Sequence, residues 1–384
     1  MRRVGDSPSD RSRKLRDPVH KDIHLGPREL RVIDTPELQR LRGIRQLGAA
    51  FYVYPGAQHS RFEHAVGTCW MAKRILSCIE QRGAAGLPDE EERAVCLAAL
   101  VHDVTHIPFG HTFEDERKLL PRHDRSEARY AHFLEGGALG ETLREDEAGR
   151  LALEIMRPGA EMPAGRRYLR QIVSGTICAD LLDYLKRDNY YCGLSQEYDE
   201  RVFHCFGLAG GQFVLRLHHR GVFRRDALSE VTNLLRIRYV LSERVYYHHA
   251  KIACGVMISK LIERALGTGM EEAELYPLTD DALPFYLQQR CGTDPAVRDL
   301  LAGLRARGLY KRCYMLSRGI GEERVRELVA RQGGSVWVEE AMSGGARLVV
   351  ELPESKRSAE GSEAPAGARV APLVENPVPE SSAD

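Results

Sequence analysis

The sequence predicts a mainly α-helical protein with a small β-hairpin insert and a small α+β appendage near the C-terminus. Apolar residues recur at helical spacing over most of residues 28–265, which is the first observation behind this fold class. Alternating apolar and polar residues, which indicate strands, occupy only a few short stretches. The chain has 384 residues, enough for one large helical domain and an appendage.

Two predicted helices place histidines toward the interior. The first covers residues 60–80 and has His64 in its first turn. The second covers residues 90–106, is more apolar, and contains the adjacent pair His102 and Asp103. An adjacent His-Asp pair inside apolar sequence is costly to bury unless something binds it. These two segments therefore predict a buried polar site.

A third helix is predicted over residues 166–191, with Asp180 on its apolar stripe. A lone carboxylate on a core face needs a cation or several hydrogen-bond donors. His102 and His106 are four residues apart, so they are predicted to stack on one face of the second helix. Imidazole and carboxylate together suit a divalent cation, whereas single buried histidines usually bond to a carbonyl. Spacing alone leaves both interpretations open.

The rest of the chain supplies the domain organisation. Further predicted elements are a hairpin of 212–217 with 220–223 across His218-His219, a long helix over 226–266, two to four helices within 270–330, and strands at 334–340 and 346–352. The predicted domains are a disordered arm (1–15), the main helical domain (16–265), a C-terminal helical region ending in a β-hairpin (266–352), and a disordered tail (353–384).

Composition restricts the partners and the compartment. Lys+Arg and Asp+Glu both number 55, so no net charge attracts nucleic acid, and a nucleic-acid partner is not indicated. Nine cysteines without a Cys-x-x-Cys pair indicate reduced thiols and a cytoplasmic protein. The N-terminus has no apolar leader, and no run approaches 18 apolar residues, so neither a signal peptide nor a membrane partner is expected.

Several motifs, taken together, are specific for one superfamily. They lie at residues 16–20, 32–42, 46–48, 54–57, 59–64, 102–103, 107–111, 183–188, 238 and 245–248. With them the chain resembles the HD-domain metal-dependent phosphohydrolases, in particular the dNTP triphosphohydrolase branch. The resemblance covers about two thirds of the chain and implies an HD-domain helical bundle.

The resemblance implies a role for each matching residue. The metal ligands would be His64, His102, Asp103 and Asp180, holding one divalent cation that could be Mn, Fe, Co, Ni, Zn or Mg, with Mg also expected on the substrate phosphates. The catalytic histidines would be His106, His111 as general acid, and His123. The nucleotide substrate would contact Arg61, Gln46, Leu47, Tyr184, Asp188, Arg238 and Tyr246.

The resemblance also implies regulation. Asp34, Gln39 and Arg42 match residues that bind an activating guanine nucleotide in some relatives, which form homo-oligomers. The alternative is structural: Asp34 would be the N-cap of a helix, and the other two would lie on its solvated face. Both interpretations are kept, and a homo-oligomer is expected.

The implied activity is metal-dependent hydrolysis of deoxynucleoside triphosphates to deoxynucleoside and tripolyphosphate. One departure weakens it: Leu181 stands where relatives have a phosphate-binding lysine. An HD-type phosphatase or phosphodiesterase acting on another nucleotide is therefore an alternative. A nucleotide-sensing regulator without turnover is a third possibility, although it would have no need for both His111 and a complete ligand set.

Overall fold

The computed structural model describes residues 12–81, 87–116, 118–311, 326–327, 330, 335–340 and 346–351. The chain divides into two units, Met1–Arg312 and Cys313–Asp384. Helices dominate the described part of the first unit, as the sequence predicts, and four two-stranded antiparallel sheets complete the described structure. The predicted boundary at 265/266 falls inside the first unit.

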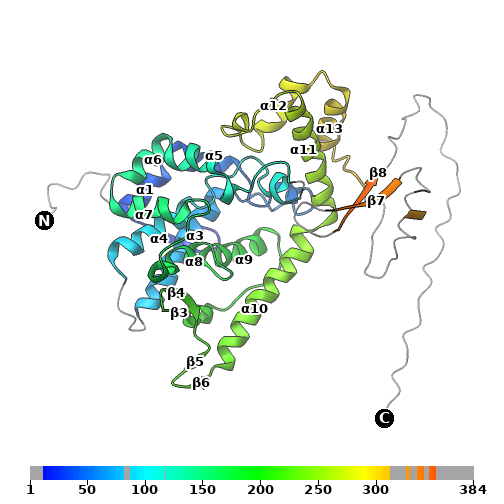
Figure 1. Cartoon of the computed structure of the whole chain (residues 1–384). Coiled ribbons are helices and arrows are strands. Elements are labelled where there is room, and N and C mark those ends of the chain that lie inside the picture. The colour runs from blue at the N-terminus through cyan, green and yellow to red at the C-terminus, as the bar shows by residue number, and fades with distance from the viewer. Residues whose placement is uncertain are drawn as a thin grey trace, which may run out of the picture. The chain divides into compact units, whose positions relative to one another are not determined.

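The elements follow one another mostly through short connections (Figure 1). The strands are β1 Arg13–Asp17, β2 Lys21–Leu25, β3 Phe206–Ala209, β4 Gln212–Leu215, β5 His218–His219, β6 Val222–Phe223, β7 Ser335–Glu340 and β8 Ala346–Glu351. The helices are α1 Pro27–Ile33, α2 Pro36–Arg40, α3 Arg61–Glu80, α4 Asp89–Val101, α5 Glu127–Tyr130, α6 Gly137–Arg144, α7 Glu147–Met156, α8 Tyr168–Val173, α9 Ala179–Tyr191, α10 Arg225–Leu241, α11 His249–Gly267, α12 Ala282–Cys291 and α13 Pro295–Arg305.

Helix α3 lies at the centre of the first unit and confirms the helix predicted at 60–80. Ser60 caps it: its Oγ accepts the Glu63 N–H, and the Glu63 carboxylate accepts the Ser60 N–H, which satisfies two end groups of the helix. α3 packs against α4 and α9, and α4 also packs against α7. The helices α3, α4 and α9 are far apart in the sequence but pack together around α3 (Figure 1). They come from the three segments that were predicted to carry the buried polar residues.

The predicted helix over 166–191 is wrong in one respect, because it is two helices. α8 ends at Val173 and α9 begins at Ala179. Gly175 lies in the break, where a Cβ would come within 2.7 Å of the Gln171 carbonyl oxygen. The break places Asp180 in the first turn of α9 instead of mid-helix. A carboxylate is favoured there because unpaired N–H groups give that end partial positive charge.

The long helix predicted over 226–266 is also interrupted. A π-helical turn, Ser242–Tyr246, separates α10 from α11, and the His248 side chain caps α11 by accepting the Ala250 N–H at 3.3 Å. The turn lets Tyr246 face α9, where its hydroxyl bonds to Asp188. The interruption therefore brings together Tyr246 and Asp188, two of the predicted substrate-binding residues.

The hairpin predicted from 212–217 and 220–223 has the wrong pairing. β4 pairs with β3, and β6 pairs with the two residues of β5. Each hairpin has its own turn: Gly210 and Gly211 at φ 57° and 74°, and Arg220 and Gly221 at φ 48° and 77°. The unrecognised Gly-Gly turn explains the error, because paired glycines supply positive φ at low cost.

Both ends of the chain were predicted with mixed success. The disordered arm predicted at 1–15 is wrong at residues 13–15, which belong to β1 and pair with β2; the residues before 12 are outside the described part. In the second unit β7 pairs with β8, which confirms the predicted C-terminal hairpin. The tail at 353–384 lies outside the described residues. No helix in the described part of the chain is long and apolar enough to span a membrane.

Candidate metal and catalytic site

Three side chains from three helices converge on one point. His64 comes from the first turn of α3, His102 directly follows α4, and Asp180 comes from the first turn of α9. Each offers one ligand atom, and these atoms lie within 4.8 Å of one another. His64 Nε2 is 3.0 Å from Asp180 Oδ1 and 3.2 Å from His102 Nε2. Three of the four predicted ligands are thus brought together.

Hydrogen bonds on the far side of each ring orient the two histidines. His102 Nδ1 donates to the Ala99 carbonyl oxygen at 2.8 Å, and His64 Nδ1 donates to Asp183 Oδ2 at 2.7 Å. If both rings were neutral, the two Nε2 lone pairs would face each other at 3.2 Å, which is repulsive unless a proton or a metal ion lies between them. Two oriented imidazoles and a carboxylate fit a divalent metal ion.

The protonation of His64 supports the same conclusion. Burial lowers the pKa of His64, but the carboxylates of Asp180 and Asp183 outweigh burial and raise this pKa to about 10. The surrounding charges therefore hold a positive charge at this ring nitrogen. A divalent ion at Nε2 would displace the proton from that nitrogen and meet Asp180, whereas Asp183 would stay bonded to Nδ1.

Asp103, the fourth predicted ligand, lies at the edge of the group. Its Oδ1 is 3.5 Å from His102 Nε2, and its Oδ2 is 3.9 Å from His64 Nε2. Arg61 Nη1 donates to the same Oδ2 at 2.6 Å. Burial raises the pKa of Asp103, but Arg61, His102 and His106 outweigh burial and hold it well below its usual value. Asp103 is therefore an anion within reach of a bound metal.

Arg61, predicted to bind the triphosphate, is instead buried and already paired with a carboxylate in this structure. Its side chain is 2% exposed and ion-paired with Asp103. A Cβ on Gly110, which has φ +39°, would lie 2.8 Å from Arg61 Nη2, so the glycine leaves room for the guanidinium. In this structure Arg61 orients Asp103. Its contact with a triphosphate stays a prediction.

Asp183 contacts His64 at Nδ1, on the side of the ring that faces away from Asp180 and His102. This supporting role was not predicted from the sequence. Asp183 accepts from His20 Nε2 at 2.6 Å and from Arg187 Nε at 2.8 Å, besides His64. Gly67, on α3, makes room for it, because a Cβ there would lie 1.9 Å from Asp183 Oδ1. A glycine inside a helix costs about 1 kcal/mol relative to alanine. The presence of Gly67 in the predicted helix was therefore the one sequence feature that indicated a close neighbour at this position.

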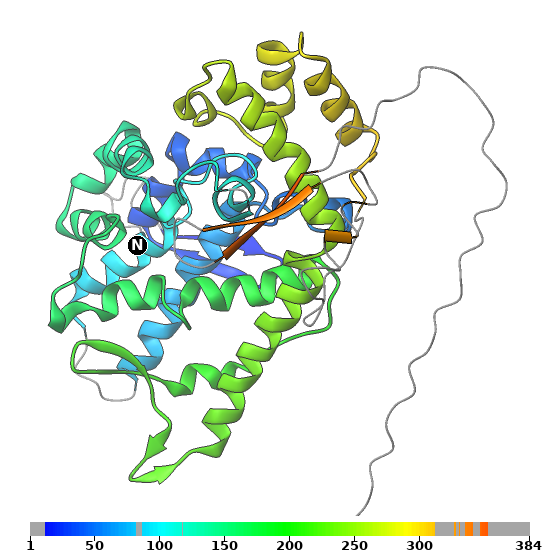
Figure 2. The same cartoon turned by 45° about the vertical axis from the view of Figure 1, so that its right-hand side comes forward.

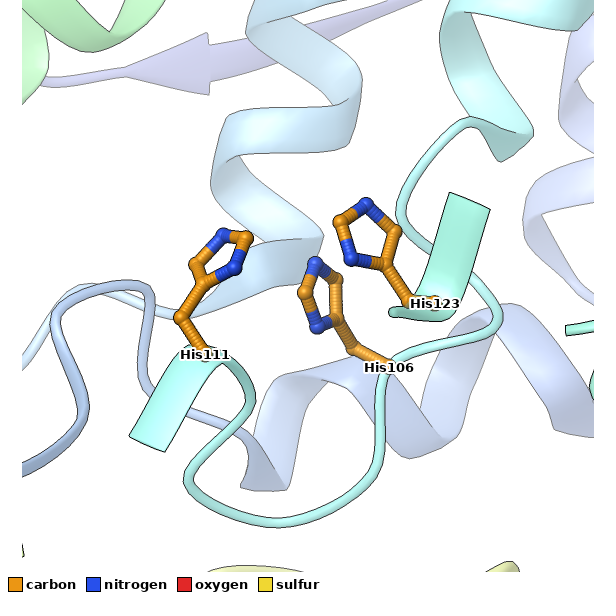
Figure 3. A group of neighbouring side chains, drawn as sticks. All are labelled: His106, His111 and His123. Carbon is orange, nitrogen blue, oxygen red and sulfur yellow. The ribbon is translucent and has the colours of Figure 1, made fainter. Parts of the chain in front are cut away.

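A second cluster contains the three predicted catalytic histidines, His106, His111 and His123 (Figure 3). The His106 ring stacks on His123 at 3.7 Å between centroids and meets His111 edge-on at 4.8 Å. The predicted stacking of His106 on His102 is wrong, because α4 ends at Val101 and His106 lies in the following turn. His106 is fully buried, whereas the His111 side chain is 44% exposed.

Glu114 and Arg129 anchor this cluster, and neither was among the predicted site residues. Glu114 accepts from His123 Nδ1 at 3.0 Å and from Arg129 Nη1 at 2.5 Å. Burial raises the pKa of Glu114, but the hydrogen bond from His123 and the charge of Arg129 outweigh burial and lower this pKa. Burial also lowers the pKa of His106, and Arg61 adds to this effect. The cluster thus combines a neutral histidine with a buried carboxylate.

The three histidines also present ring nitrogens within 4.8 Å of one another, so they too could hold a metal ion. His106 Nε2 lies 3.3 Å from Asp103 Oδ1, which joins this cluster to the group around His64. The site therefore has two adjoining parts. We call His64, His102, Asp103 and Asp180 the metal group, and His106, His111 and His123 the histidine cluster.

The predicted sugar-binding residues are partly assembled. Tyr246 Oη donates to Asp188 Oδ2 at 2.7 Å, and His59 Nε2 lies 2.9 Å from Asp188 Oδ1. The rings of Tyr184 and Tyr246 meet edge-on at 6.4 Å. Burial and then the charge of Asp180 raise the pKa of Tyr184, and the nearby Arg238 opposes this. His59 was not among the predicted site residues, although it belongs to the motif at 59–64.

Three other residues were predicted to bind the substrate, namely Gln46, Leu47 and Arg238. Gln46 donates its backbone N–H to the His59 carbonyl oxygen at 3.0 Å, and its side-chain Oε1 is buried without a hydrogen-bond partner in the described structure. Leu47 is half-buried against the core, and Arg238 is exposed on α10. Their contacts with a substrate stay predictions.

Two of the three predicted regulatory residues, Gln39 and Arg42, are in direct contact, and the Gln39 amide donates to the carbonyl of Ile33, the residue before Asp34. Asp34 is exposed and ends α1, so its prediction as an N-cap is wrong; Thr35 occupies that position before α2. Gln39 Oε1 accepts from Arg42 Nε at 2.8 Å. The Arg42 guanidinium lies 3.6 Å from the centre of the Phe62 ring, next to Arg61 in the chain. Arg42 thus links the α2 surface to the first turn of α3.

Comparison with known families agrees with this geometry. Residues 61–188, which contain the metal group and the histidine cluster, match the HD domain. This chain therefore contains an HD domain. Residues 214–362 match the HD associated region, which covers α10 to α13 and the C-terminal hairpin.

Relatives of this HD-domain protein include both characterised and uncharacterised chains. The uncharacterized protein YwfO of Bacillus subtilis is 32% identical over 260 residues, 65% of this chain and 55% of that protein. The deoxynucleoside triphosphate triphosphohydrolase SAMHD1 of Homo sapiens is 27% identical over 350 residues, 79% of this chain and 55% of that protein. The chain thus spans about half the length of these relatives.

Solved structures share the fold. A hypothetical protein from Aquifex aeolicus has a TM-score of 0.69 and 23% identity, over 88% of this chain and 90% of that chain. A phosphohydrolase from Bacteroides thetaiotaomicron has a TM-score of 0.62 and 22% identity, over 88% of this chain and 94% of that chain. These likenesses confirm the helical HD fold.

Proposed function

We propose that this HD-domain protein is a metal-dependent phosphohydrolase that converts deoxynucleoside triphosphates to deoxynucleoside and tripolyphosphate. The observation that supports it most is the convergence of His64, His102 and Asp180 beside the histidine cluster. The similarity to deoxynucleoside triphosphate triphosphohydrolases favours this substrate class over other phosphate esters.

The metal group would hold one divalent cation through His64, His102, Asp180 and Asp103. Such a cation supplies Lewis acidity toward a phosphoryl oxygen and lowers the pKa of water. Asp183 and the Ala99 carbonyl keep the two imidazoles in the orientation that binding requires.

Proton transfer would fall to the histidine cluster. His111 is the most exposed of its three histidines, so it is the one that can meet a substrate oxygen. In the proposed reaction water attacks the α-phosphorus, the bond from phosphorus to the 5′-oxygen breaks, and His111 protonates that oxygen. Glu114, fixed by Arg129, would hold His123 in place throughout.

Sugar selection would fall to the ring pair Tyr184 and Tyr246 together with Asp188. Tyr184 lies one helical turn after Asp180 on α9, so its ring can lie under a sugar whose phosphate is at the metal group. Asp188 has two fixed neighbours, His59 and Tyr246, and is suited to accept a sugar hydroxyl.

A second candidate function is hydrolysis of another nucleotide by a phosphatase or phosphodiesterase reaction. Leu181 favours it, because this residue is 3% exposed and directs no positive charge toward a triphosphate. A regulator that binds nucleotide without turnover is the remaining alternative.

One screen separates these functions. Purified protein is incubated with dNTPs, NTPs and monophosphates, each with Mn²⁺, Mg²⁺, Co²⁺ or Fe²⁺, and the products are resolved by chromatography. Release of tripolyphosphate from dNTPs is the expected result. Stepwise release of orthophosphate would overturn the triphosphohydrolase proposal in favour of a phosphatase, and binding without any product would favour the regulator.

A further inference from the structure

We infer that Asp280, which lies in the HD associated region and outside the HD domain, is a positioning residue for His111. It holds the backbone of the loop that carries His111, and the inference rests on the role of His111 in the proposed function. Asp280 lies two residues before α12, which packs with α11 and α13 in one group that both views show (Figures 1 and 2). The Asp280 side chain is fully buried.

Both carboxylate oxygens of Asp280 accept backbone N–H groups from distant segments. Oδ1 accepts the Phe109 N–H and Oδ2 accepts the Arg45 N–H, each at 2.8 Å. The backbone N–H of Asp280 donates in turn to the Gly43 carbonyl oxygen at 3.0 Å. Asp280 therefore joins the segment before α3 to the loop that follows α4.

Phe109 has a backbone conformation that a bulky residue rarely adopts. Its φ is 58°, and the φ of the following Gly110 is 39°. Such a conformation persists only where the surrounding structure fixes it. The bond to Asp280 fixes the Phe109 N–H, and the Phe109 ring lies with Ile258 and Leu283 around one small apolar cavity. Backbone and side chain of Phe109 are thus both held by residues of the HD associated region.

The conformation of Phe109 sets the position of His111. His111 follows two residues later in a tight turn, in which the Thr112 N–H donates to the Phe109 carbonyl oxygen at 3.2 Å. A rotation of Phe109 to negative φ would reorient this turn and move the His111 ring away from His106, which it meets edge-on at 4.8 Å. A shift of about 1 Å in a reacting group can lower turnover about 100-fold.

The two N–H groups require two acceptors, and the ionised carboxylate supplies them. Burial raises the pKa of Asp280 to about 6, and the bonds from the Arg45 and Phe109 N–H groups oppose this rise, as do the charges of Arg45 and Arg61. The carboxylate is therefore ionised at neutral pH. Asparagine has the same size, but its amide NH₂ would face one of the two N–H donors and leave that donor without an acceptor.

A double-mutant cycle tests the inference. Asp280→Asn, His111→Ala and the double variant are compared with the parent protein in dNTP hydrolysis with Mn²⁺. Asp280→Asn should lower kcat about 10–100-fold and change KM less than about threefold, because the buried Asp280 side chain cannot contact a substrate. The double variant should have the same kcat as His111→Ala, since a residue that acts through His111 has no effect once His111 is gone. Effects that multiply would overturn the inference.

The leaving group gives an independent readout. Bis(4-nitrophenyl) phosphate releases nitrophenolate, which departs without a proton, so a general acid contributes little to its hydrolysis. Asp280→Asn and His111→Ala should each lower metal-dependent hydrolysis of this ester less than about threefold. Equal losses on dNTPs and on the ester in Asp280→Asn would indicate general damage to the site and would overturn the positioning role.

Asp281→Asn is the matched control. Asp281 is the next residue, its side chain is 80% exposed, and it pairs with the same Arg45 at 3.0 Å. This variant should keep kcat within about twofold of the parent protein. Asp280→Glu keeps the charge and both acceptor oxygens but adds one methylene. It replaces Asp280→Asn in the cycle, with the same expected result, if circular dichroism shows that Asp280→Asn is unfolded.

Hydrogen exchange separates this inference from the proposed function. In Asp280→Asn the amides of residues 107–113 should exchange at least about tenfold faster while those of α4 stay unchanged, whether or not the protein hydrolyses dNTPs. Unchanged exchange there, or full kcat in Asp280→Asn beside an impaired His111→Ala, would overturn the inference alone. Full activity in His111→Ala would overturn the proposed role of His111 and the inference with it. If the parent protein cleaves the ester but no dNTP, the proposed function fails, and the exchange data decide whether Asp280 holds the loop.

Discussion

Asp183 accepts a hydrogen bond from His64 at 2.7 Å, and this contact fixes which nitrogen of His64 faces the metal group. The same carboxylate is held by His20 and by Arg187, and the side chains of all three residues are almost fully buried. Arg187 is shared in turn with Asp17 at 2.9 Å. A chain of charge-assisted bonds therefore extends from the N-terminal hairpin to the metal group.

Removing the charge of Asp183 tests this support. Asp183→Asn weakens orientation of His64, and loss of such a supporting partner typically lowers metal affinity about 10–100-fold. Isothermal titration with Mn²⁺ measures the change. Asp17→Asn is the control, because it removes the other carboxylate of Arg187 and destabilises the fold without contacting His64. Equal loss of metal affinity in both variants would reduce the effect to general destabilisation.

Glu114 provides a prediction on pH. Its pKa is lowered in the folded protein, so its contribution to stability is present above the unfolded value of about 4.5 and is lost as pH falls below it. Glu114→Gln should cost about 1.5–3 kcal/mol at neutral pH, because the buried Arg129 loses its charged partner Glu114 and keeps only Glu272, at 2.6 Å.

Urea unfolding of the parent protein and of Glu114→Gln over pH 3–7 measures this directly. The stability difference between the two proteins should be constant at neutral pH and shrink below about pH 4.5. A difference that stayed constant down to pH 3 would show that the pKa of Glu114 is not lowered in the folded state.

Tyr184 is expected to select the sugar. Tyr184→Ala should relax the preference for dNTPs over NTPs, because its ring would no longer lie beneath the sugar next to Tyr246. Competition assays with matched dNTP and NTP pairs give the ratio of kcat/KM. Tyr190→Ala, an exposed tyrosine on the same helix, is the control. Equal turnover of dNTPs and NTPs by the parent protein would remove the proposed role.

Arg42 tests the predicted activating nucleotide site. Arg42→Ala should reduce activation by a guanine nucleotide about fivefold or more while metal content stays constant, since Arg42 contacts Gln39 and Phe62 but not the metal group. Arg298→Ala serves as an exposed control. Light scattering should show a homo-oligomer. A monomer with strictly hyperbolic kinetics would contradict both the assembly and the activation.

The convergence of His64, His102 and Asp180 could be predicted from the sequence because its signals are local. His64, Asp103 and Asp180 stand out as charged or titratable groups in apolar helices, and burial of such groups requires partners. The α3 helix was predictable from its capping pattern and its apolar period. Neither signal depends on knowing which helices pack together.

The supporting residues were not predictable in the same way. Glu114 and Arg129 come from separate segments, and only the folded chain brings them to 2.5 Å. The breaks within 166–191 and 226–266 were missed because an apolar period continues across them while the backbone does not. Local periodicity reports which face is buried but is insensitive to an interruption of a few residues.

The most direct test of the proposed site compares Asp180→Ala with His111→Ala by metal analysis and steady-state kinetics, with the exposed His132→Ala as control. Asp180→Ala should lose the metal, because a charged ligand disappears. His111→Ala should keep the metal and lose about 10²–10⁴ in kcat, the range for a proton-transfer group. Loss of metal from His111→Ala, or full activity in it, would contradict the division between metal group and histidine cluster.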